Sequence, residues 1–151
     1  MEIADRSAPT RLRELPTWLI NQAALSASRL VSAGLAGAGA RRHHYSLLAA
    51  LDEGGPASQA ALSRRTTIDR SDMVATINEL LERGLVDRIA DPTDRRRKVV
   101  SITPAGRREL RRLDRLLAGV QDDFLAPLPA AERERLVRTL TRLVDHHAGR
   151  R

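Results

Sequence analysis

The chain has 151 residues, of which 42% are hydrophobic, so it is long enough to bury one substantial core. With 26 Lys and Arg against 19 Asp and Glu, its formal net charge of +7 favours a polyanionic partner such as DNA, RNA or an acidic membrane surface. The lack of cysteine excludes disulfides and thiolate chemistry, and without a signal peptide or an apolar run of roughly 20 residues we expect a cytoplasmic protein that does not span a membrane.

The predicted elements follow changes in hydrophobic periodicity along the chain. Residues 10–40 favour helix and end in a stretch rich in Gly and Ala, and a second helix is expected over residues 42–52. Ser58 is a suitable N-cap for a short helix, and Asp69 for a longer one that Gly84 ends.

After Gly84 the hydrophobic period changes from 3.6 to two in the runs LVDRI and KVVSI, which predicts a β-hairpin over residues 85–102. Thr103 and Pro104 form the N-cap and first position of a further helix. After PLPA a last helix is expected over residues 131–147.

The order of these elements predicts the fold class. A short helix, a tight turn and a longer helix followed at once by a two-stranded hairpin form the winged helix–turn–helix arrangement. We therefore expect a mainly α protein with a small β-hairpin wing, in which residues 42–103 form the DNA-binding part. The helices of residues 10–40 and 104–148 are expected to form the dimer. The second helix of the pair suits a major groove, and the hairpin tip suits the adjacent minor groove.

The stretch DPTDRRRKVV places three arginines and the only lysine of the chain on the turn of the predicted hairpin. By itself, such a run is typical of a solvated hairpin tip. Behind a helix–turn–helix it favours contact with DNA, because a narrow minor groove concentrates the negative potential that arginine side chains match.

The segment ALSRRTTIDRSDMVATINELLERGLVDRIADPTDRRRKVVSITPAG resembles the DNA-binding core of the MarR (multiple antibiotic resistance regulator) family. Its most specific part is DPTDRR followed by an apolar strand and ITPAG, and ELLERGLVDR has the family's pattern and spacing. The resemblance covers residues 42–106 strongly and the flanking helices by order and length. It implies homodimers that bind pseudo-palindromic operators, usually as repressors released by small ligands.

The resemblance also implies which residues meet DNA. The recognition helix covers residues 69–83, the hairpin tip enters the minor groove, and Asp94 braces the wing through an ion pair. The predicted contacts are Arg70, Ser71, Asp72, Ala75 and Thr76 in the major groove, Arg95 and Arg96 in the minor groove, and Ser58, Gln59, Ser63, Arg64, Thr66, Thr67, Arg97 and Lys98 on the backbone. Many relatives carry an arginine at the position of Ala75, so the wing is expected to supply more of the affinity here.

The long helix after Thr103 has apolar residues at alternating spacings of three and four, a seam typical of helix pairing. Such a seam is explained by packing against a helix of the same chain or by pairing with a second copy. We expect pairing with a second copy. The predicted dimerisation residues are Leu110, Leu113, Leu117, Val120, Phe124, Leu136, Leu140 and Leu143.

Arg42, His43, His44 and Tyr45 at the start of the second helix are candidates for a ligand pocket, because effectors of the family bind near this helix. Trp18 is a further candidate, although a single Trp also suits packing. Adjacent histidines point about 100° apart on a helix, so we expect no metal site here. His146 and His147 are expected to be exposed.

The sequence predicts a sequence-specific DNA-binding regulator and no enzyme, because no motif places a nucleophile beside a base and no Gly-rich loop follows a strand. Its expected partners are double-stranded DNA, a second copy and an unidentified small effector, with no cofactor. Two alternatives stay open: a winged-helix module for protein–protein contact, and a metal-responsive regulator.

Overall fold

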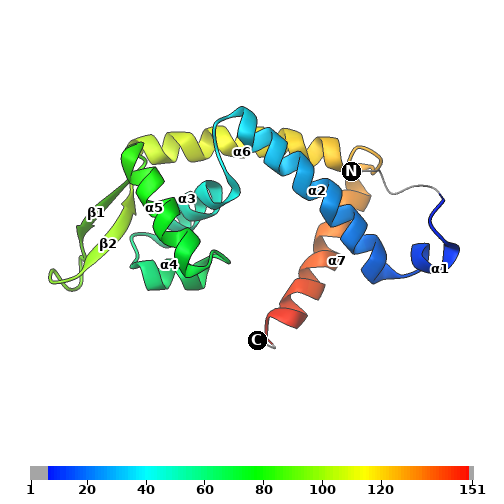
Figure 1. The fold of residues 1–151 in the computed structure, drawn as a ribbon, viewed down its shortest axis with the longest axis horizontal. Helices are drawn as coiled ribbons and strands as arrows, with labels where there is room; N and C mark the ends of the chain where they lie inside the picture. Colours follow the sequence, from blue (N-terminus) through cyan, green and yellow to red (C-terminus); the bar gives the residue numbers. More distant parts are fainter. Residues whose placement is uncertain (1–6, 150–151) are drawn as a thin grey trace.

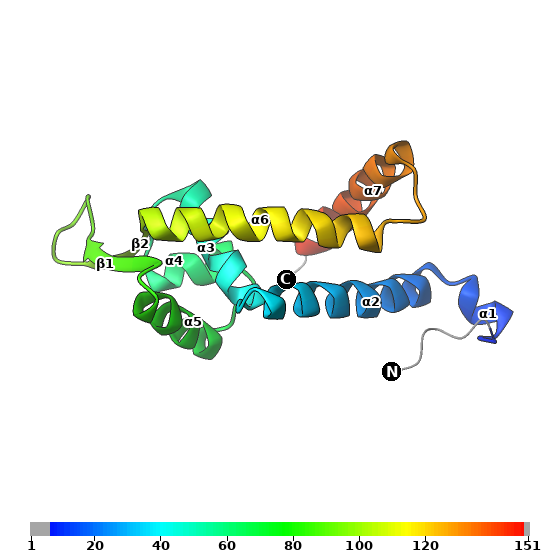
Figure 2. The same cartoon turned by 90° about the horizontal axis from the view of Figure 1, so that it is seen from above.

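The computed structural model describes residues 7–149, arranged as a small lobe at one end of a pair of long helices (Figures 1 and 2). In chain order the elements are α1 (Thr10–Arg13), α2 (Pro16–Gly37), α3 (Arg42–Gly54), α4 (Gln59–Arg65), α5 (Arg70–Glu82), β1 (Val86–Ala90), β2 (Lys98–Ile102), α6 (Pro104–Phe124) and α7 (Ala130–Ala148). The lobe contains α3, α4, α5 and the hairpin, whereas α2 and α6 run side by side away from it. The expected fold class is confirmed.

The helix starts form where suitable capping residues lie. The hydroxyl of Ser58 accepts from the Ala61 N–H, and the carboxylate of Asp69 accepts from the Asp72 N–H. Gly84 follows α5 with φ of 69°, a left-handed conformation that favours glycine and lets the chain turn into the hairpin. The expected caps are therefore confirmed, although the first helical segment is divided because Pro16 begins α2 as a separate helix.

The hairpin is antiparallel, with Val86 opposite Ile102 and Ala90 opposite Lys98. Ala57, just before α4, also pairs with Val100 through two backbone hydrogen bonds of 3.0 and 2.9 Å. This short bridge ties the base of the wing to the start of the helix–turn–helix, so the two parts are held in one orientation.

The lobe has its own aliphatic core, in which α3, α4, α5 and the hairpin meet. Met73, Ile77 and Leu80 are fully buried there, at the spacing expected for the inner face of α5. A second, smaller cluster joins Leu35 of α2 to Leu113 of α6. The helix pair and the lobe are therefore connected by packed side chains.

Two predicted dimerisation residues belong to these cores. Leu110 is 6% exposed within the core of the lobe, and Leu113 is fully buried against α2. Because they are already covered within one chain, the dimer role predicted for these two residues is wrong, and packing within the chain explains this part of the seam. Leu117, Val120, Phe124 and Leu136 are half-buried, whereas Leu140 and Leu143 are exposed.

The start of α6 lies directly against the turn between α5 and β1. The Thr103 hydroxyl donates to the Gly84 carbonyl at 2.7 Å, and the Thr103 N–H donates to the Leu85 carbonyl at 3.1 Å. Gly106 lies so close that a Cβ there would be 2.1 Å from the Leu85 carbonyl oxygen. This contact fixes α6, and with it the pair of long helices, to the end of α5.

Candidate nucleic-acid interface

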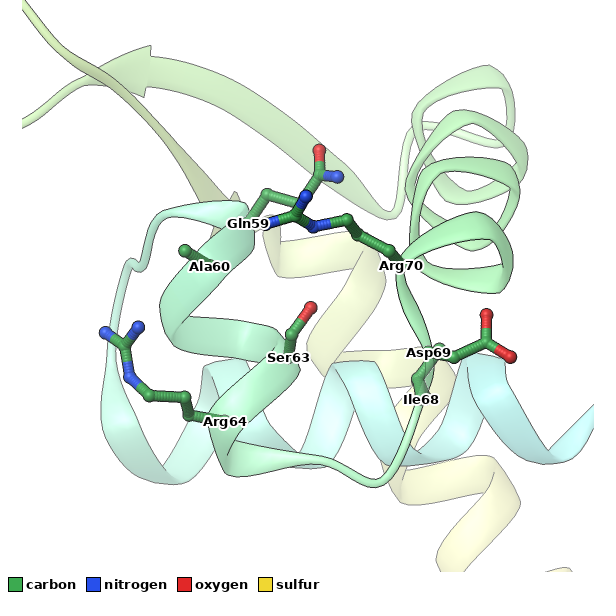
Figure 3. Close-up of a pocket in the computed structure, with 7 residues that line it drawn as sticks. All are labelled: Gln59, Ala60, Ser63, Arg64, Ile68, Asp69 and Arg70. Carbon is green, nitrogen blue, oxygen red and sulfur yellow. The ribbon is translucent and has the colours of Figure 1, made fainter.

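The helix–turn–helix presents a cleft between α4 and the start of α5, which polar and apolar side chains line (Figure 3). Gln59 and Ser63 line it from α4, and Arg70 lines it from the first turn of α5. Arg64 extends from the end of α4, where its guanidinium has no carboxylate partner among residues 7–149. These donors lie at the positions where a winged helix–turn–helix meets phosphates.

The outer face of α5 presents Arg70, Ser71, Asp72 and Ala75 to solvent, as predicted for a face that enters a groove. Thr76 does not belong to this face. It is 3% exposed, and its hydroxyl donates to the Asp72 carbonyl at 2.6 Å. The prediction that Thr76 points outward is therefore wrong, because it lies on the inner face between Met73 and Leu80.

Two residues on the outer face of α5 were missed by the sequence reasoning. Val74 is 45% exposed, and Asn78 is exposed one turn further along the helix. The signal was present, since both lie opposite the buried stripe of α5. A valine suits the methyl group of thymine, and an asparagine suits the major-groove edge of adenine. The outer face of α5 therefore carries more side chains that suit base edges than Ala75 alone indicates.

The wing tip is ordered by its acidic residues. The Asp91 carboxylate accepts hydrogen bonds from the backbone N–H and from the hydroxyl of Thr93. Both bonds lower the pKa of Asp91, and the bond from the backbone has the larger effect. The Asp94 carboxylate accepts from the Arg96 N–H at 3.1 Å and lies 3.9 Å from the Arg97 guanidinium. These contacts fit the bracing role predicted for Asp94.

The other two wing arginines have free guanidinium groups. Within residues 7–149, the side chains of Arg95 and Arg96 make no hydrogen bond or ion pair, and both are exposed. Lys98 is also exposed, at the start of β2. An ordered turn that holds uncommitted arginines outward is suited to bind a polyanion.

The side of α5 that carries Glu79 is held by the first turn of α3. The guanidinium of Arg41 donates to one carboxylate oxygen of Glu79, and His44 lies 2.5 Å from the other. His44 is 6% exposed, and its Nδ1 accepts from the Arg41 N–H, so its Nε2 donates to Glu79. The hydrogen bond from Arg41 and, with a smaller effect, the one from His44 lower the pKa of Glu79 to about 2. The carboxylate is therefore ionised at neutral pH.

A cavity of about 460 Å³ lies between α2, α3 and α6. Its wall is mostly apolar, with Ala27, Val31 and Leu117 among the lining residues. The Arg42 guanidinium lies at this cavity, and it donates to the carbonyl and the hydroxyl of Ser28 at 2.5 and 2.6 Å. No carboxylate pairs with Arg42 among residues 7–149.

Tyr45 also lines this cavity, and its hydroxyl donates to Asp114 at 2.7 Å, which raises the pKa of the phenol to about 12. The other predicted pocket residues lie elsewhere. Trp18 is half-buried at the start of α2, His43 lies 3.6 Å from Asp72, and His44 contacts Glu79. These three residues do not line this cavity, and for His43 and His44 the reason is that successive side chains of α3 point in different directions.

The part of the chain that the structure describes holds no group of three His, Asp or Glu side chains placed to bind a metal ion. No helix within residues 7–149 has the length and apolar character that crossing a bilayer requires.

Several known proteins are similar to this chain. A putative transcriptional regulatory protein for the hcr operon of Thauera aromatica is 38% identical over 99 residues, which make up 66% of this chain and 60% of that protein. The crystal structure of a probable transcriptional regulator from Pseudomonas aeruginosa has 35% identity and a TM-score of 0.75, covering 88% of this chain and 99% of the other. CouR from Rhodococcus jostii RHA1, solved with bound p-coumaroyl-CoA, has 26% identity and a TM-score of 0.74 over 89% of this chain and 95% of CouR. The chain thus spans about three fifths of the length of the curated relative.

A winged helix–turn–helix protein is defined by the capped helices α4 and α5, the exposed outer face of α5 and the basic hairpin. A model of the MarR family matches residues 38–97, from the end of α2 to the wing tip. With the P. aeruginosa structure similar along nearly its whole length, the chain belongs to the MarR family.

Proposed function

We propose that this protein is a homodimeric transcriptional repressor that binds pseudo-palindromic operators and is released by a small ligand. The observation that carries the proposal is the wing tip, where Asp94 orders a turn that holds Arg95 and Arg96 outward without partners among residues 7–149. The outer face of α5 supports it, because Ser71, Val74 and Asn78 present groups that suit base edges. A dimer lying across a promoter would exclude RNA polymerase, which is the basis for proposing repression.

A dimer is supported by exposed apolar side chains near the start of α2 and on α7. Leu15, Leu19 and Ile20 on and before α2 are 43–48% exposed, and on α7 Leu143 is 43% exposed. A second copy that covers these faces would join two lobes about a two-fold axis. Two recognition helices would then enter successive major grooves, about 34 Å apart.

We expect the double change Leu140→Asp and Leu143→Asp to produce monomers. Both side chains are exposed in one chain, at 38% and 43%, so the fold should survive while an apolar interface gains two charges on each side. Light scattering should show half the mass of the unaltered protein. Arg138→Asp, on the opposite face of α7, is the control and should stay dimeric. An intact dimer of the double variant would contradict this placement.

The ligand that fits the cavity between α2, α3 and α6 is a small organic carboxylate with an apolar body. Arg42 offers a guanidinium that lacks a carboxylate partner within residues 7–149, and the surrounding wall is apolar. CouR, which is 26% identical, is solved with a ligand that contains an aromatic acyl group. 4-Hydroxycinnamate, which has an aromatic ring and a carboxylate, is therefore a suitable first probe.

The proposed function is tested by fluorescence anisotropy with a palindrome from the protein's own promoter region and a scrambled duplex of equal composition. We expect at least a roughly hundredfold preference for the palindrome. The affinity should fall by about a hundredfold or more between 50 and 200 mM salt, because arginines displace counterions from phosphates. Binding that is indifferent to sequence and salt would instead favour a module for protein–protein contact.

A further inference from the structure

The first turn of α3, residues 41–45, has two faces that lead to different parts of the molecule. Arg42 and Tyr45 line the cavity between α2, α3 and α6. Arg41 and His44 contact Glu79 on the side of α5 that faces α3. This division follows from helix geometry, because residues three apart lie on the same face and adjacent residues do not. One turn of helix therefore connects the cavity to α5.

Both faces of this turn are held firmly. On the cavity side, Arg42 donates to the carbonyl and hydroxyl of Ser28, and Tyr45 donates to Asp114. On the other side, both nitrogens of the buried His44 ring are engaged, one by the Arg41 backbone and the other by Glu79. A ligand that draws Arg42 towards its carboxylate would therefore move a turn whose Arg41, His44 and Tyr45 side chains are each hydrogen-bonded to another helix.

Glu79 is well placed to receive such a motion. It lies one turn after Ala75 on the same face of α5, and its carboxylate is the point where Arg41 and His44 converge. A second contact joins His43 to Asp72 at 3.6 Å, but these side chains are 46% and 56% exposed. Water screens that pair, so it contributes less to the position of α5.

We propose that residues 41–45 transmit occupancy of the cavity to the recognition helix through Glu79, so that Arg41, His44 and Glu79 are positioning residues for DNA binding. The proposal rests on the proposed function as a ligand-released repressor. It assigns the coupling to one carboxylate on α5, and not to the packing of Leu47 and Leu48, which also lies between α3 and the rest of the lobe.

The test is a double-mutant cycle that needs no identified ligand. Ala27→Phe places an aromatic ring in the cavity and stands in for a bound ligand. Operator affinity is measured for the unaltered protein, for Ala27→Phe, for Glu79→Gln and for the combination. We expect Ala27→Phe to weaken operator binding at least tenfold in the unaltered background and less than twofold with Glu79→Gln. An equal loss in both backgrounds, or no loss in either, would overturn the proposal.

Glu82→Gln is the matched control, because it removes a carboxylate from the same helix that has no partner within residues 7–149. With it, Ala27→Phe should keep its full tenfold effect. If Glu79→Gln does not fold, Arg41→Gln replaces it, since the Arg41 side chain is 65% exposed and lies outside the core. Full retention of the Ala27→Phe effect with Arg41→Gln would likewise overturn the proposal.

A readout that does not involve DNA separates this inference from the proposed function. The Nε2 proton of His44, hydrogen-bonded to Glu79, is expected to give a resolved downfield proton signal. Ala27→Phe should shift this signal even in free protein, and an unchanged signal would contradict the coupling. Failure of the unaltered protein to bind any operator would instead overturn the proposed function. The His44 signal would still report whether the cavity is coupled to α5.

Discussion

Replacing Arg95 and Arg96 together by alanine should weaken operator binding by at least a hundredfold, or about 2.8 kcal/mol. The two guanidinium groups extend from an ordered turn and make no side-chain contact within residues 7–149, so their loss removes contacts to DNA without removing contacts in the protein. Because each protomer of a dimer contributes both arginines, each operator loses its contacts with four guanidinium groups. Fluorescence anisotropy with the promoter palindrome measures the loss.

The fold should be unaffected by this change, because the bonds that order the wing come from Asp91, Asp94 and backbone groups. An unchanged thermal midpoint checks this. Arg111→Ala with Arg115→Ala removes the same charge from exposed positions on α6 and should weaken binding by less than about threefold. If the wing variant binds as tightly as this control, the wing tip is solvated and does not contact DNA.

Gly106→Ala should destabilise the protein by about 3 kcal/mol and lower its thermal midpoint by roughly 10 °C. The new Cβ would lie 2.1 Å from the Leu85 carbonyl oxygen and 2.7 Å from the Ile102 side chain. The first neighbour is backbone that also accepts the Thr103 N–H, so it cannot move without breaking the junction between α5, the hairpin and α6.

Gly119→Ala on the same helix is the matched control. Nothing lies within 4 Å of a Cβ at that position, so alanine should be neutral or raise the stability by about 0.5–1 kcal/mol through its higher helix propensity. Thermal unfolding of both variants distinguishes them. Equal midpoints would mean that the contact between α6 and the α5–β1 turn is not close in solution.

Local patterns in the sequence were sufficient to predict the fold. Ser58, Asp69 and Thr103 cap their helices as expected, because an N-cap depends only on residues a few positions apart. The change of period after Gly84 likewise predicted the hairpin. Thr76 was placed on the wrong face although its spacing from Met73 and Leu80 marks it as inner, so this error was avoidable.

Contacts between distant segments were not predictable in the same way. Glu79 is 35 residues from His44, and no local pattern connects them. The seam on α6 has the same spacing whether it faces α2 or a second copy, and Leu113 shows that part of it faces α2. Arg42 and Tyr45 line the cavity between α2, α3 and α6, but the wall contributed by α2 depends on how the helices pack.

Hydroxyl-radical footprinting of the promoter palindrome tests the central claim most directly, because it reports which minor grooves the protein covers. We predict two protected half-sites, centred about 10 base pairs apart, with flanking minor-groove protection that disappears when Arg95 and Arg96 are replaced by alanine. Equal protection of a scrambled duplex, or flanking protection that persists in the variant, would contradict a dimeric operator-binding protein that places its wings in the minor groove.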